Sequence, residues 1–222
     1  MRVNDIFYSL QGEGRNTGRA AVFVRFAGCN LRCPFCDTEF DTFREMTAEE
    51  IANTIKSLVP SNQTPLPSGG VGGGLLIVLT GGEPTLQVDE AFVDLLHQHG
   101  YEVAMESNGT RPAPMNLDWL TVSPKEMRKE NQRSAAEGKV KGEMRKDWRQ
   151  PDELKIVFEE DTDPDDVISH SSLLIPHYLY LQPCDTGDAE RNAYIINRCV
   201  DYIKAHPQWR LSLQTHKLVG FK

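Results

Sequence analysis

The chain of 222 residues lacks any apolar run that approaches the roughly 20 residues needed by a membrane-spanning helix. Its first residues, MRVND, lead into no hydrophobic region of the signal-peptide type. It also lacks an excess of basic residues, because 24 lysines and arginines stand against 32 aspartates and glutamates, a formal net charge of −8. A general nucleic-acid-binding surface would be basic. We therefore expect neither a membrane protein nor a nucleic-acid-binding protein.

Cysteine is also scarce. The chain has five, an odd number, and three of them lie within eight residues. A disulfide framework usually has an even number of cysteines, so this arrangement fits metal ligation in a reducing compartment better. The apolar content of 39% and the charged content of 25% are those of an ordinary globular protein. We expect one cytoplasmic domain that covers residues 1–222.

The clustered cysteines lie in the run GCNLRCPFCDT, residues 28–38, as Cys29, Cys33 and Cys36 with the spacing C-x3-C-x2-C. Thiolates are soft ligands that suit zinc or an iron–sulfur cluster. A structural zinc site normally has four ligands, and no second Cys or His pair follows at a suitable distance. A four-iron cluster held by three cysteines leaves one iron open for another ligand. The spacing therefore favours an iron–sulfur cluster.

Hydrophobic patterning predicts short strands that alternate with helices. A capping box at Thr47–Glu50 begins one helix, and Gly100 ends another. The predicted strands cover residues 20–27, 75–79, 101–105, 119–122, 153–158, 178–182 and 210–214, and two predicted helices cover residues 88–99 and 189–205. Repeated strand–loop–helix order predicts a parallel sheet, closed or partly closed, with fewer helices than strands.

Two segments do not fit this alternation. Residues 60–74 are rich in proline, serine and glycine, which predicts a surface loop. Residues 126–150 are mostly charged, which favours a solvated helical excursion over a lid or partner-binding segment. We interpret both as insertions.

Polar motifs follow the predicted strands: TGGEP at 80–84, SPK at 123–125 and QPCD at 182–185. Each motif alone is weak, because glycines serve any tight turn and the residue before a proline avoids helix. In parallel barrels, however, the chemistry gathers where strands end. The shared position of the three motifs therefore predicts one common site.

The cysteine spacing resembles the signature of the radical S-adenosylmethionine enzymes. The flanking runs IFYSLQGEG (6–14) and AVFVRFAGC (21–29) are similar to 7-carboxy-7-deazaguanine synthases, and patches of likeness continue to LQTHK (213–217). The resemblance implies an α/β fold, a partial (β/α) TIM-like barrel of the radical S-adenosylmethionine type with reduced helix content. It also implies a [4Fe–4S] cluster on Cys29, Cys33 and Cys36, whose open iron binds S-adenosylmethionine.

The same resemblance implies a cofactor pocket for the rest of S-adenosylmethionine. Its implied members are Gly82, Ser123, Pro124, Lys125, Gln182, Pro183, Cys184 and Asp185. A fourth cluster ligand at Cys184 would close the iron that the chemistry needs open, so we do not expect it. Cys199 lies on an apolar helix face and is predicted to be a small core residue.

The resemblance also implies sites for Mg²⁺ and for substrate. Thr38 is the implied hydroxyl ligand of Mg²⁺, although Asp37-Thr38 alone is typical of a turn or a helix cap. Substrate contacts are implied for Leu10, Gln11, Gly12, Arg25 and Thr80, with Glu13 and His216 as weaker candidates. By itself, Arg25 suits a structural salt bridge as well as a carboxylate clamp; the resemblance favours the clamp.

The implied reaction converts 6-carboxy-5,6,7,8-tetrahydropterin to 7-carboxy-7-deazaguanine with loss of ammonia, in queuosine biosynthesis. An electron from the cluster would cleave S-adenosylmethionine, and the 5′-deoxyadenosyl radical would remove hydrogen from C6 before the ring contracts. S-adenosylmethionine would be regenerated. The resemblance further implies a flavodoxin-like electron donor and a homodimer.

Two alternative functions stay open. A radical activase acting on a partner protein would need an open groove, and such activases often carry additional cluster cysteines, which are missing here. A zinc-binding interaction module would use the three cysteines and a histidine. The run QGE at 11–13 and the polar strand ends argue against both, by resemblance.

Overall fold

The computed structural model describes residues 1–33, 36, 42–59, 75–125, 148–170 and 176–222. These residues build one nine-stranded sheet with the strand order β3-β1-β2-β4-β5-β6-β7-β8-β9. The strands are β1 (Arg2–Leu10), β2 (Ala20–Phe26), β3 (Arg44–Glu45), β4 (Leu76–Gly81), β5 (Glu102–Ser107), β6 (Trp119–Val122), β7 (Glu153–Phe158), β8 (Tyr178–Pro183) and β9 (Trp209–Leu211). The helices are α1 (Ala48–Leu58), the 3-10 turn η1 (Pro84–Leu86), α2 (Glu90–Gln98), α4 (Pro164–His170), α5 (Ala189–Ala205) and α6 (Thr215–Val219).

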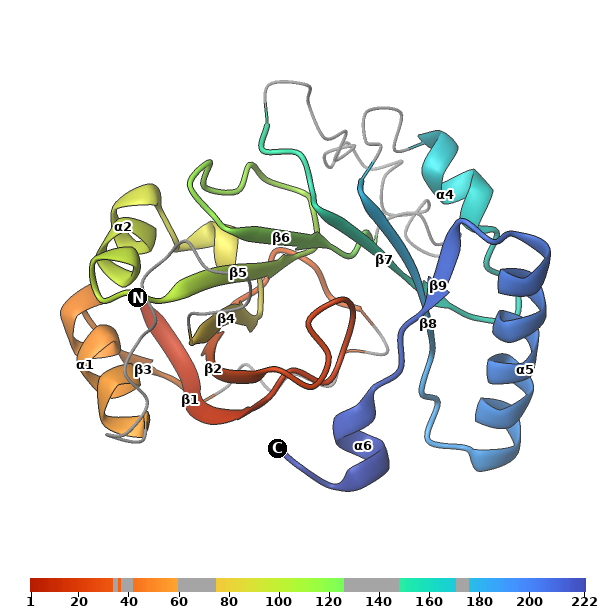
Figure 1. The fold of residues 1–222 in the computed structure, drawn as a ribbon, viewed down its shortest axis with the longest axis horizontal. Coiled ribbons are helices and arrows are strands. Elements are labelled where there is room, and N and C mark those ends of the chain that lie inside the picture. The colour runs from red at the N-terminus through yellow and green to blue at the C-terminus, as the bar shows by residue number, and fades with distance from the viewer. Residues whose placement is uncertain (34–35, 37–41, 60–74, 126–147, 171–175) are drawn as a thin grey trace.

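The sheet is parallel from β2 to β9, which confirms the prediction from the strand–loop–helix order. Only the first edge departs from it, because β1 is antiparallel to both β2 and β3. The sheet curves strongly, and its two edges, β3 and β9, do not pair with each other (Figure 1). The fold is therefore a partial barrel, as expected. Within the described residues, no helix has the length and apolar character to cross a membrane.

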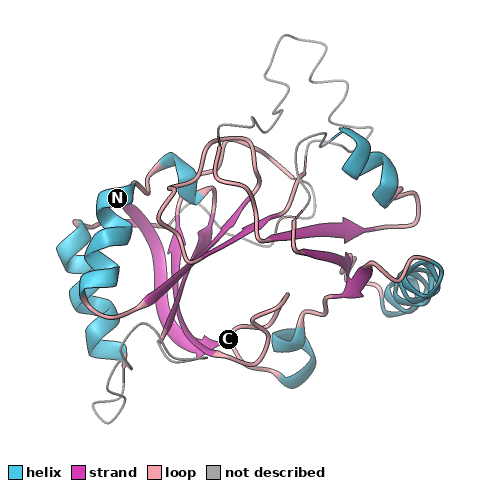
Figure 2. Ribbon diagram, turned by 45° about the horizontal axis from the view of Figure 1, so that its top comes forward, coloured by secondary structure: helices cyan, strands magenta, loops and turns pink. Residues whose placement is uncertain are grey.

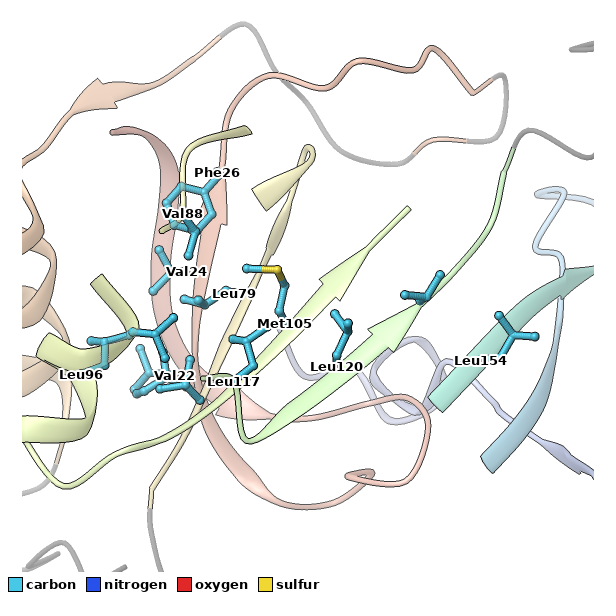
Figure 3. Close-up of a cluster of buried hydrophobic side chains, with 14 of the residues drawn as sticks. Val22, Val24, Phe26, Leu79, Val88, Leu96, Met105, Leu117, Leu120 and Leu154 are labelled. Atoms are coloured by element: carbon cyan, nitrogen blue, oxygen red, sulfur yellow. The ribbon is translucent and has the colours of Figure 1, made fainter. Parts of the chain in front are cut away.

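The main hydrophobic core lies on the outer face of this curved sheet, between strands and helices (Figure 3). Along β2 the outward residues Val22, Val24 and Phe26 are fully buried. They pack in one cluster with Leu96 of α2, because alternate side chains of a strand share a face. Cys199 of α5 is fully buried in the same cluster. The prediction that this cysteine is a core residue is confirmed.

On β2, β4 and β5 the inner face of the sheet is apolar near the N-terminal ends of the strands. A small second cluster there contains Ala21, Leu76, Val78 and Ala104. Further along β2, the inward position is taken by Arg25, which pairs with Thr80 of β4. The curved sheet therefore changes from apolar to polar along its inner face.

The helix starts follow the capping chemistry in the sequence. In α1, the Glu50 amide donates to the Thr47 hydroxyl at 3.2 Å, and the Thr47 amide donates to the Glu50 carboxylate at 2.8 Å. This reciprocal pair is the predicted capping box. Asp89 caps α2 and Asp188 caps α5 in the same way, by accepting a backbone amide. The predicted helix at 88–99 therefore starts at Glu90.

Two β-strands and two α-helices were not predicted, and the last predicted strand is wrong in extent. The predicted strand at 210–214 ends at Leu211, because Gln214 already precedes α6. The unpredicted elements are β1, β3, α4 and α6. Hydrophobic patterning did not predict strand β1, because only two of its nine residues are buried and it has no continuous apolar pattern. Residues 60–74 and 126–147, which hold most of the two predicted insertions, lie outside the described residues.

The last segment of the chain returns to the first strand. Lys222 forms an ion pair with Asp5 of β1 at 2.7 Å, and Lys217 of α6 forms one with Asp185 after β8 at 2.8 Å. Figure 2 shows α6 between these two regions. The C-terminal segment thus links the two sides of the open barrel.

The core predicts a clear stability contrast between two leucines. Leu96 is 0% exposed, whereas Leu218 in α6 is 70% exposed. We expect Leu96→Ala to lower the free energy of unfolding by about 2–5 kcal/mol, because it leaves a cavity in the core. Leu218→Ala should change it by less than about 0.5 kcal/mol. Urea unfolding of both variants measures this, and equal effects would contradict the assigned core.

Candidate functional site

A cavity of about 470 Å³ opens on the inner face of the sheet, at the C-terminal ends of the parallel strands. Three parts of the chain that are distant in sequence line it: the cysteine run, the polar segments after β4, β5, β6 and β8, and the segment after β1. The volume is within the usual range for small-molecule sites. The tertiary structure therefore brings the predicted motifs to one place.

Almost all of the predicted site residues that the structure describes line this cavity. They are Leu10, Gln11, Gly12, Glu13, Arg25, Cys29, Cys33, Cys36, Thr80, Gly82, Ser123, Lys125, Gln182, Pro183, Cys184, Asp185 and His216. Pro124 is the exception, and Thr38 lies outside the described residues. Within the described residues, no three Cys, His, Asp or Glu side chains already stand together as a metal cage. The roles of the individual residues stay predictions.

The turn after β4 packs backbone to backbone against the start of the cysteine run. The Gly82 amide donates to the Phe26 carbonyl at 2.7 Å, and the Glu83 amide donates to the Gly28 carbonyl at 2.9 Å. A Cβ atom on Gly82 would lie 2.0 Å from the Gly28 oxygen. Glycine is required here because any side chain would push the two segments apart. The glycine at position 82 therefore permits close packing of the turn after β4 on the cysteine run.

The carboxylate of Glu83 joins this turn to the one after β5. It is 0% exposed. It accepts hydrogen bonds from the Thr85 hydroxyl at 2.7 Å, the Ser107 hydroxyl at 2.9 Å and the Asn108 amide at 2.7 Å. A buried carboxylate is destabilising unless such donors satisfy it. With three partners, Glu83 makes the two strand ends one rigid unit.

Asn108 connects that unit to the first cysteine. Its Nδ2 lies 3.8 Å from the Cys29 Sγ and donates to the Asn30 side chain at 3.0 Å. The Leu31 amide lies 3.4 Å from the same sulfur. Burial raises the pKa of the Cys29 thiol. Amide groups near a ligand sulfur orient it and are one means of tuning a bound cluster.

A buried lysine on β7 forms the charged centre of the cavity. The ammonium of Lys155 pairs with the carboxylate of Glu13 and, at 3.3 Å, with that of Glu106. Gln11 donates to Glu106 at 2.9 Å, and Gln214 donates to Glu13 at 3.1 Å. The two carboxylates therefore share one cation and are held in place by two amides.

The ionisation of this cluster is set by competition between burial and charge. Burial alone would raise the pKa of Glu13, but the Lys155 ammonium lowers it to about 2. Burial alone would also lower the pKa of Lys155, but Glu106 and Glu13 raise it above its ordinary value. Glu13 and Lys155 are consequently both charged at neutral pH, and the cavity carries fixed charges of both signs.

Lys125 adds a second ammonium at the end of β6. It donates to the Ser123 hydroxyl at 2.8 Å, and Ser123 donates to the Lys155 carbonyl at 2.7 Å. Burial, followed by repulsion from Lys155, lowers the pKa of Lys125 to about 8. An ammonium in such surroundings is poorly solvated, so it gains most by binding an anion.

Arg25 lies beside a pair of aromatic rings. Phe7 and Phe23 stack with their centroids 5.0 Å apart, and the Arg25 guanidinium carbon is 5.3 Å from the Phe7 ring centroid. Among the ion pairs of the described residues none involves Arg25, and its strand neighbour Asp5 pairs with Lys222. The structural salt bridge, one of the two roles considered for Arg25, is therefore not formed within the described part of the chain.

Asp185, predicted in the cofactor pocket, is engaged by its own loop. Its carboxylate accepts hydrogen bonds from Lys217 at 2.8 Å, the Gly187 amide at 3.0 Å and the Asn192 amide group at 2.8 Å. The bond from Lys217, followed by that from Gly187, lowers the pKa of Asp185 to about 2. These contacts fix the segment after β8, whatever ligand it meets.

His216 reaches the cavity from α6 and packs on Gly12. A Cβ atom on Gly12 would lie 2.6 Å from the His216 Nδ1. The Thr215 amide donates to the Gly12 carbonyl at 3.0 Å. These contacts hold together two segments that are about 200 residues apart in sequence. Residue 12 must be glycine because a side chain there would clash with His216.

Residues 11–13 reach the cavity from the opposite edge of the sheet to the motifs that follow the parallel strands. Because β1 is antiparallel to β2, its end at Leu10 pairs with Ala20, the first residue of β2. The β1–β2 loop, residues 11–19, therefore enters from the N-terminal edge of the parallel strands. It reaches the cavity by turning inside the curve of the sheet, where Figure 1 shows it in red.

Comparison with known proteins identifies the family. A profile described as "Radical SAM superfamily" matches residues 23–150. The 7-carboxy-7-deazaguanine synthase of Bacteroides thetaiotaomicron is 40% identical over 221 residues, which cover 100% of this chain and 98% of that protein. The enzyme of the same name from Nitratidesulfovibrio vulgaris is 40% identical over 245 residues, covering 99% of this chain and 98% of that protein.

The chain belongs to the 7-carboxy-7-deazaguanine synthase family. This confirms the resemblance in the sequence, and membership of the radical S-adenosylmethionine superfamily confirms the two predicted cofactors, a [4Fe–4S] cluster and S-adenosylmethionine. The crystal structure of QueE from Escherichia coli matches with a TM-score of 0.68 and 24% identity, covering 96% of this chain and 92% of that one. At that identity the match bears on the fold alone, and it confirms the partial barrel.

Sequence reasoning missed several residues of this synthase-family cavity. Glu106 and Asn108 belong to the polar run ESNGT at 106–110, which follows the predicted strand at 101–105 in the way that the three named motifs follow theirs. Lys155 was not singled out, although it carries the same signal as Arg25, a long cation inside an apolar strand. Phe7 belongs to the unpredicted strand β1. Alternation within a strand would have placed Lys155 on the face opposite to Leu154 and Ile156.

The close packing of the glycine turn predicts an effect on cluster assembly. Gly82→Ala places a methyl group against the Gly28 backbone, so we expect displacement of the cysteine run at a cost of about 1–3 kcal/mol. Iron and sulfide per chain after anaerobic reconstitution should fall. Gly18→Ala is the control, because its φ of +85° strains the backbone but no atom lies within 4 Å. If Gly82→Ala retained full iron, the packing argument would be wrong.

The charged cluster predicts a stability change that depends on pH. Lys155→Met leaves two buried carboxylates without their cation, which should lower the free energy of unfolding by about 3–5 kcal/mol at pH 7. In the native protein the Glu13 contribution is present above pH 4.5 and is lost as pH falls toward 2. In the variant, protonation instead relieves the unpaired charge. The difference between the two proteins should therefore shrink as pH falls.

Urea unfolding of the cluster-free protein at pH 7 and pH 4 measures this difference. Lys204→Met is the control, since Lys204 and its partner Asp201 are largely exposed and we expect no measurable change. A constant difference between native protein and Lys155→Met at both pH values would contradict the assigned ion pairs.

Proposed function

We propose that this chain is a radical S-adenosylmethionine lyase that converts 6-carboxy-5,6,7,8-tetrahydropterin to 7-carboxy-7-deazaguanine with loss of ammonia. It would act in the biosynthesis of queuosine and related 7-deazapurines. The observation that carries the proposal is a single cavity lined both by three cysteines and by the buried Lys155 cluster with Glu13 and Glu106. The 40% identity over the whole chain to enzymes named for this product supports it.

The donor set of the cavity fits a four-iron cluster. Cys29, Cys33 and Cys36 all line it, and Asn108 and Leu31 already place N–H groups near the first sulfur. Three thiolates leave one iron for S-adenosylmethionine, and when bound, the reduced cluster supplies the electron that starts the radical chemistry. The protein itself would hold the cysteine run against the turn after β4 and exclude water from the cavity.

The ends of β4, β6 and β8 form the proposed S-adenosylmethionine pocket. The ammonium of Lys125, with its lowered pKa, suits the methionine carboxylate, and the Ser123 hydroxyl fixes that ammonium. The glycine turn at Gly82 lets the cofactor approach the backbone. Segment 182–185, fixed through Asp185, would meet the ribose and adenine.

The inner face of β1, β2 and β7 forms the proposed pterin pocket. The Arg25 guanidinium, which has no carboxylate partner among the described residues, would bind the substrate carboxylate bidentately. The stacked Phe7 and Phe23 rings offer an apolar surface to a flat ring. Glu13 and Gln11 would bond the ring edge through the oxygens and amides that face the cavity. Leu10, Gly12, Thr80 and His216 complete this lining.

The charged cluster has a positioning task in this scheme. A substrate whose reacting hydrogen is misplaced by about 1 Å loses on the order of 10²-fold in rate. Lys155 keeps Glu13 ionised and fixed, so the carboxylate acts as a directional acceptor toward a ring N–H group. Fixed charges aimed into a closed cavity orient a polar ring without reorganising during the reaction.

Further parts of the proposal extend the family assignment. We propose that Thr38, outside the described residues, contributes a hydroxyl ligand to Mg²⁺, which would act as a Lewis acid on the substrate carboxylate. A flavodoxin-like protein would donate electrons, and the protein would act as a cytoplasmic homodimer. Residues 1–222 would form one domain, with insertions at 60–74 and 126–150.

Turnover tests the proposal against the two alternatives. Anaerobically reconstituted protein receives S-adenosylmethionine, dithionite, Mg²⁺ and carboxytetrahydropterin, and products are read by mass spectrometry. We expect 7-carboxy-7-deazaguanine. Formation of 5′-deoxyadenosine without that product would keep the superfamily chemistry but reopen the substrate, as for a radical activase. Bound zinc without either product would support an interaction module.

The cysteines predict a matched pair of variants in this assay. Cys33→Ala removes a proposed cluster ligand, so we expect loss of iron and of all product. Cys199→Ala removes a sulfur that is buried in α5 and away from the cavity. It should lower stability only, with iron content and turnover unchanged. Loss of iron in both variants would contradict the assignment of the ligands.

A further inference from the structure

A buried carboxylate lies beneath the cavity, at the N-terminal edge of the sheet, and is not among the residues that line it. Glu153 is the first residue of β7 and is 2% exposed. Its side chain projects from the same face as that of Lys155, two residues further along. The two strands next to β7 begin at Trp119 (β6) and Tyr178 (β8). Glu153 therefore occupies the floor of the open barrel.

The β1–β2 loop, residues 11–19, rests directly on this carboxylate. The Arg15 amide donates to Glu153 Oε2 at 3.0 Å, and the side chain of Trp119 also hydrogen-bonds to Glu153. Gly14 has a φ of +64°, and a Cβ atom there would lie 2.1 Å from Glu153 Oε1. The turn at Gly14 can approach this closely only because it has no side chain.

Two further contacts fix the same turn from other directions. The Gly14 amide donates to the Ser212 hydroxyl at 3.1 Å. The Arg15 guanidinium carbon lies 4.6 Å from the Trp119 ring centroid and 5.6 Å from that of Tyr178, so cation–π attraction holds the side chain at the strand ends. Residues 14 and 15 are therefore bound to β6, β7, β8 and the segment after β9.

Glu13 lies immediately before this fixed turn and points into the cavity. Its carboxylate meets Lys155 and Gln214 there. Since Glu153 holds the backbone on one side of Glu13, the position of the Glu13 carboxylate depends on a group that does not line the cavity. Burial raises the pKa of Glu153, and the Arg15 amide and Lys155 partly offset that rise. A carboxylate at this depth is destabilising unless donors satisfy it, and one of the donors to Glu153 is the backbone of the loop itself, which points to a positional role.

We propose that Glu153 is a positioning residue for substrate: it holds the Gly14–Arg15 turn so that Glu13 faces the flat, polar ring of the pterin. This inference rests on the proposed function, since it assigns Glu13 to substrate. S-adenosylmethionine is proposed to bind at the strand ends above, away from this floor. Substitution of Glu153 should therefore weaken the binding of the pterin and leave the binding of S-adenosylmethionine nearly unchanged.

Three variants test the assignment. Glu153→Ala removes the acceptor; Gly14→Ala leaves Glu153 in place but drives a methyl group against its carboxylate. Glu153→Gln keeps an oxygen that can accept from the Arg15 amide. The matched control is Asp152→Asn, the neighbouring carboxylate at the same edge, which accepts from the Leu120 amide at 2.8 Å instead of from the loop.

We expect the KM for carboxytetrahydropterin to rise about tenfold or more in Glu153→Ala and Gly14→Ala, about 1.4 kcal/mol of lost binding per factor of ten. The KM for S-adenosylmethionine and the rate of 5′-deoxyadenosine formation without pterin should stay within about twofold. Glu153→Gln should recover most of the loss, and Asp152→Asn should resemble the native protein. Equal losses for both small molecules, or the same pterin loss in Asp152→Asn, would overturn the proposal.

Hydrogen exchange separates this proposal from the proposed function. Amides of residues 12–18 should exchange faster in Glu153→Ala and Gly14→Ala than in the native protein or in Asp152→Asn, while β5 and β7 keep their protection. If the native protein makes no deazaguanine, the proposed function fails, and faster loop exchange still supports the positioning of the loop by Glu153. Unchanged loop exchange overturns the positioning role whether or not the native protein turns over.

Discussion

Two backbone hydrogen bonds, from Gly82 to Phe26 and from Glu83 to Gly28, fix the cysteine run relative to the sheet. They continue the parallel pairing of β2 with β4 beyond the last paired residues of the two strands. The Glu83 side chain then ties the same turn to the end of β5. The loop that carries the three thiols therefore begins at a fixed backbone position. The buried Glu83 carboxylate and the ends of β4 and β5 hold that position. The geometry of the whole cavity depends on this anchor.

The chain can keep charge inside the barrel because the two faces of each strand are chemically separate. On β7, Leu154 and Ile156 belong to the outer core, while Glu153 and Lys155 point inward. The outer core, part of which is shown in Figure 3, gives the strand its stability. The inner face is then free to carry groups that destabilise on burial, provided that each has a partner. Lys155 meets that condition with two carboxylates.

Loops from the two ends of the barrel supply different groups to the same cavity. Segments at the C-terminal strand ends carry the cysteines and the proposed cofactor residues. The β1–β2 loop comes from the opposite end and supplies Gln11 and Glu13. It reaches the same cavity because Glu153 and Ser212 hold its turn inside the curved sheet. The cavity is therefore lined from one end by segments that follow the parallel strands and from the other end by the β1–β2 loop.

Much of the fold and of the site was predictable from the sequence. Strands β6 and β7 and helix α5 have the bounds that patterning predicts, because period-two and period-3.6 burial are local signals. The cysteine spacing and the polar motifs at strand ends are local too, so cluster ligands and cofactor candidates could be named. Strand β1 and helix α6 were missed because few of their residues are buried, so neither has a continuous apolar pattern.

The sequence by itself determined which functional groups are present: three thiols at ligand spacing, glycines where backbones must meet, and lone cations such as Arg25 inside apolar strands. Only the tertiary structure decided which of these groups meet. The pairing of Lys155 with Glu13, 142 positions away, depends on a loop entering an antiparallel edge and turning onto Glu153. No local pattern encodes that contact, because it forms only when strands distant in the chain close around the same interior.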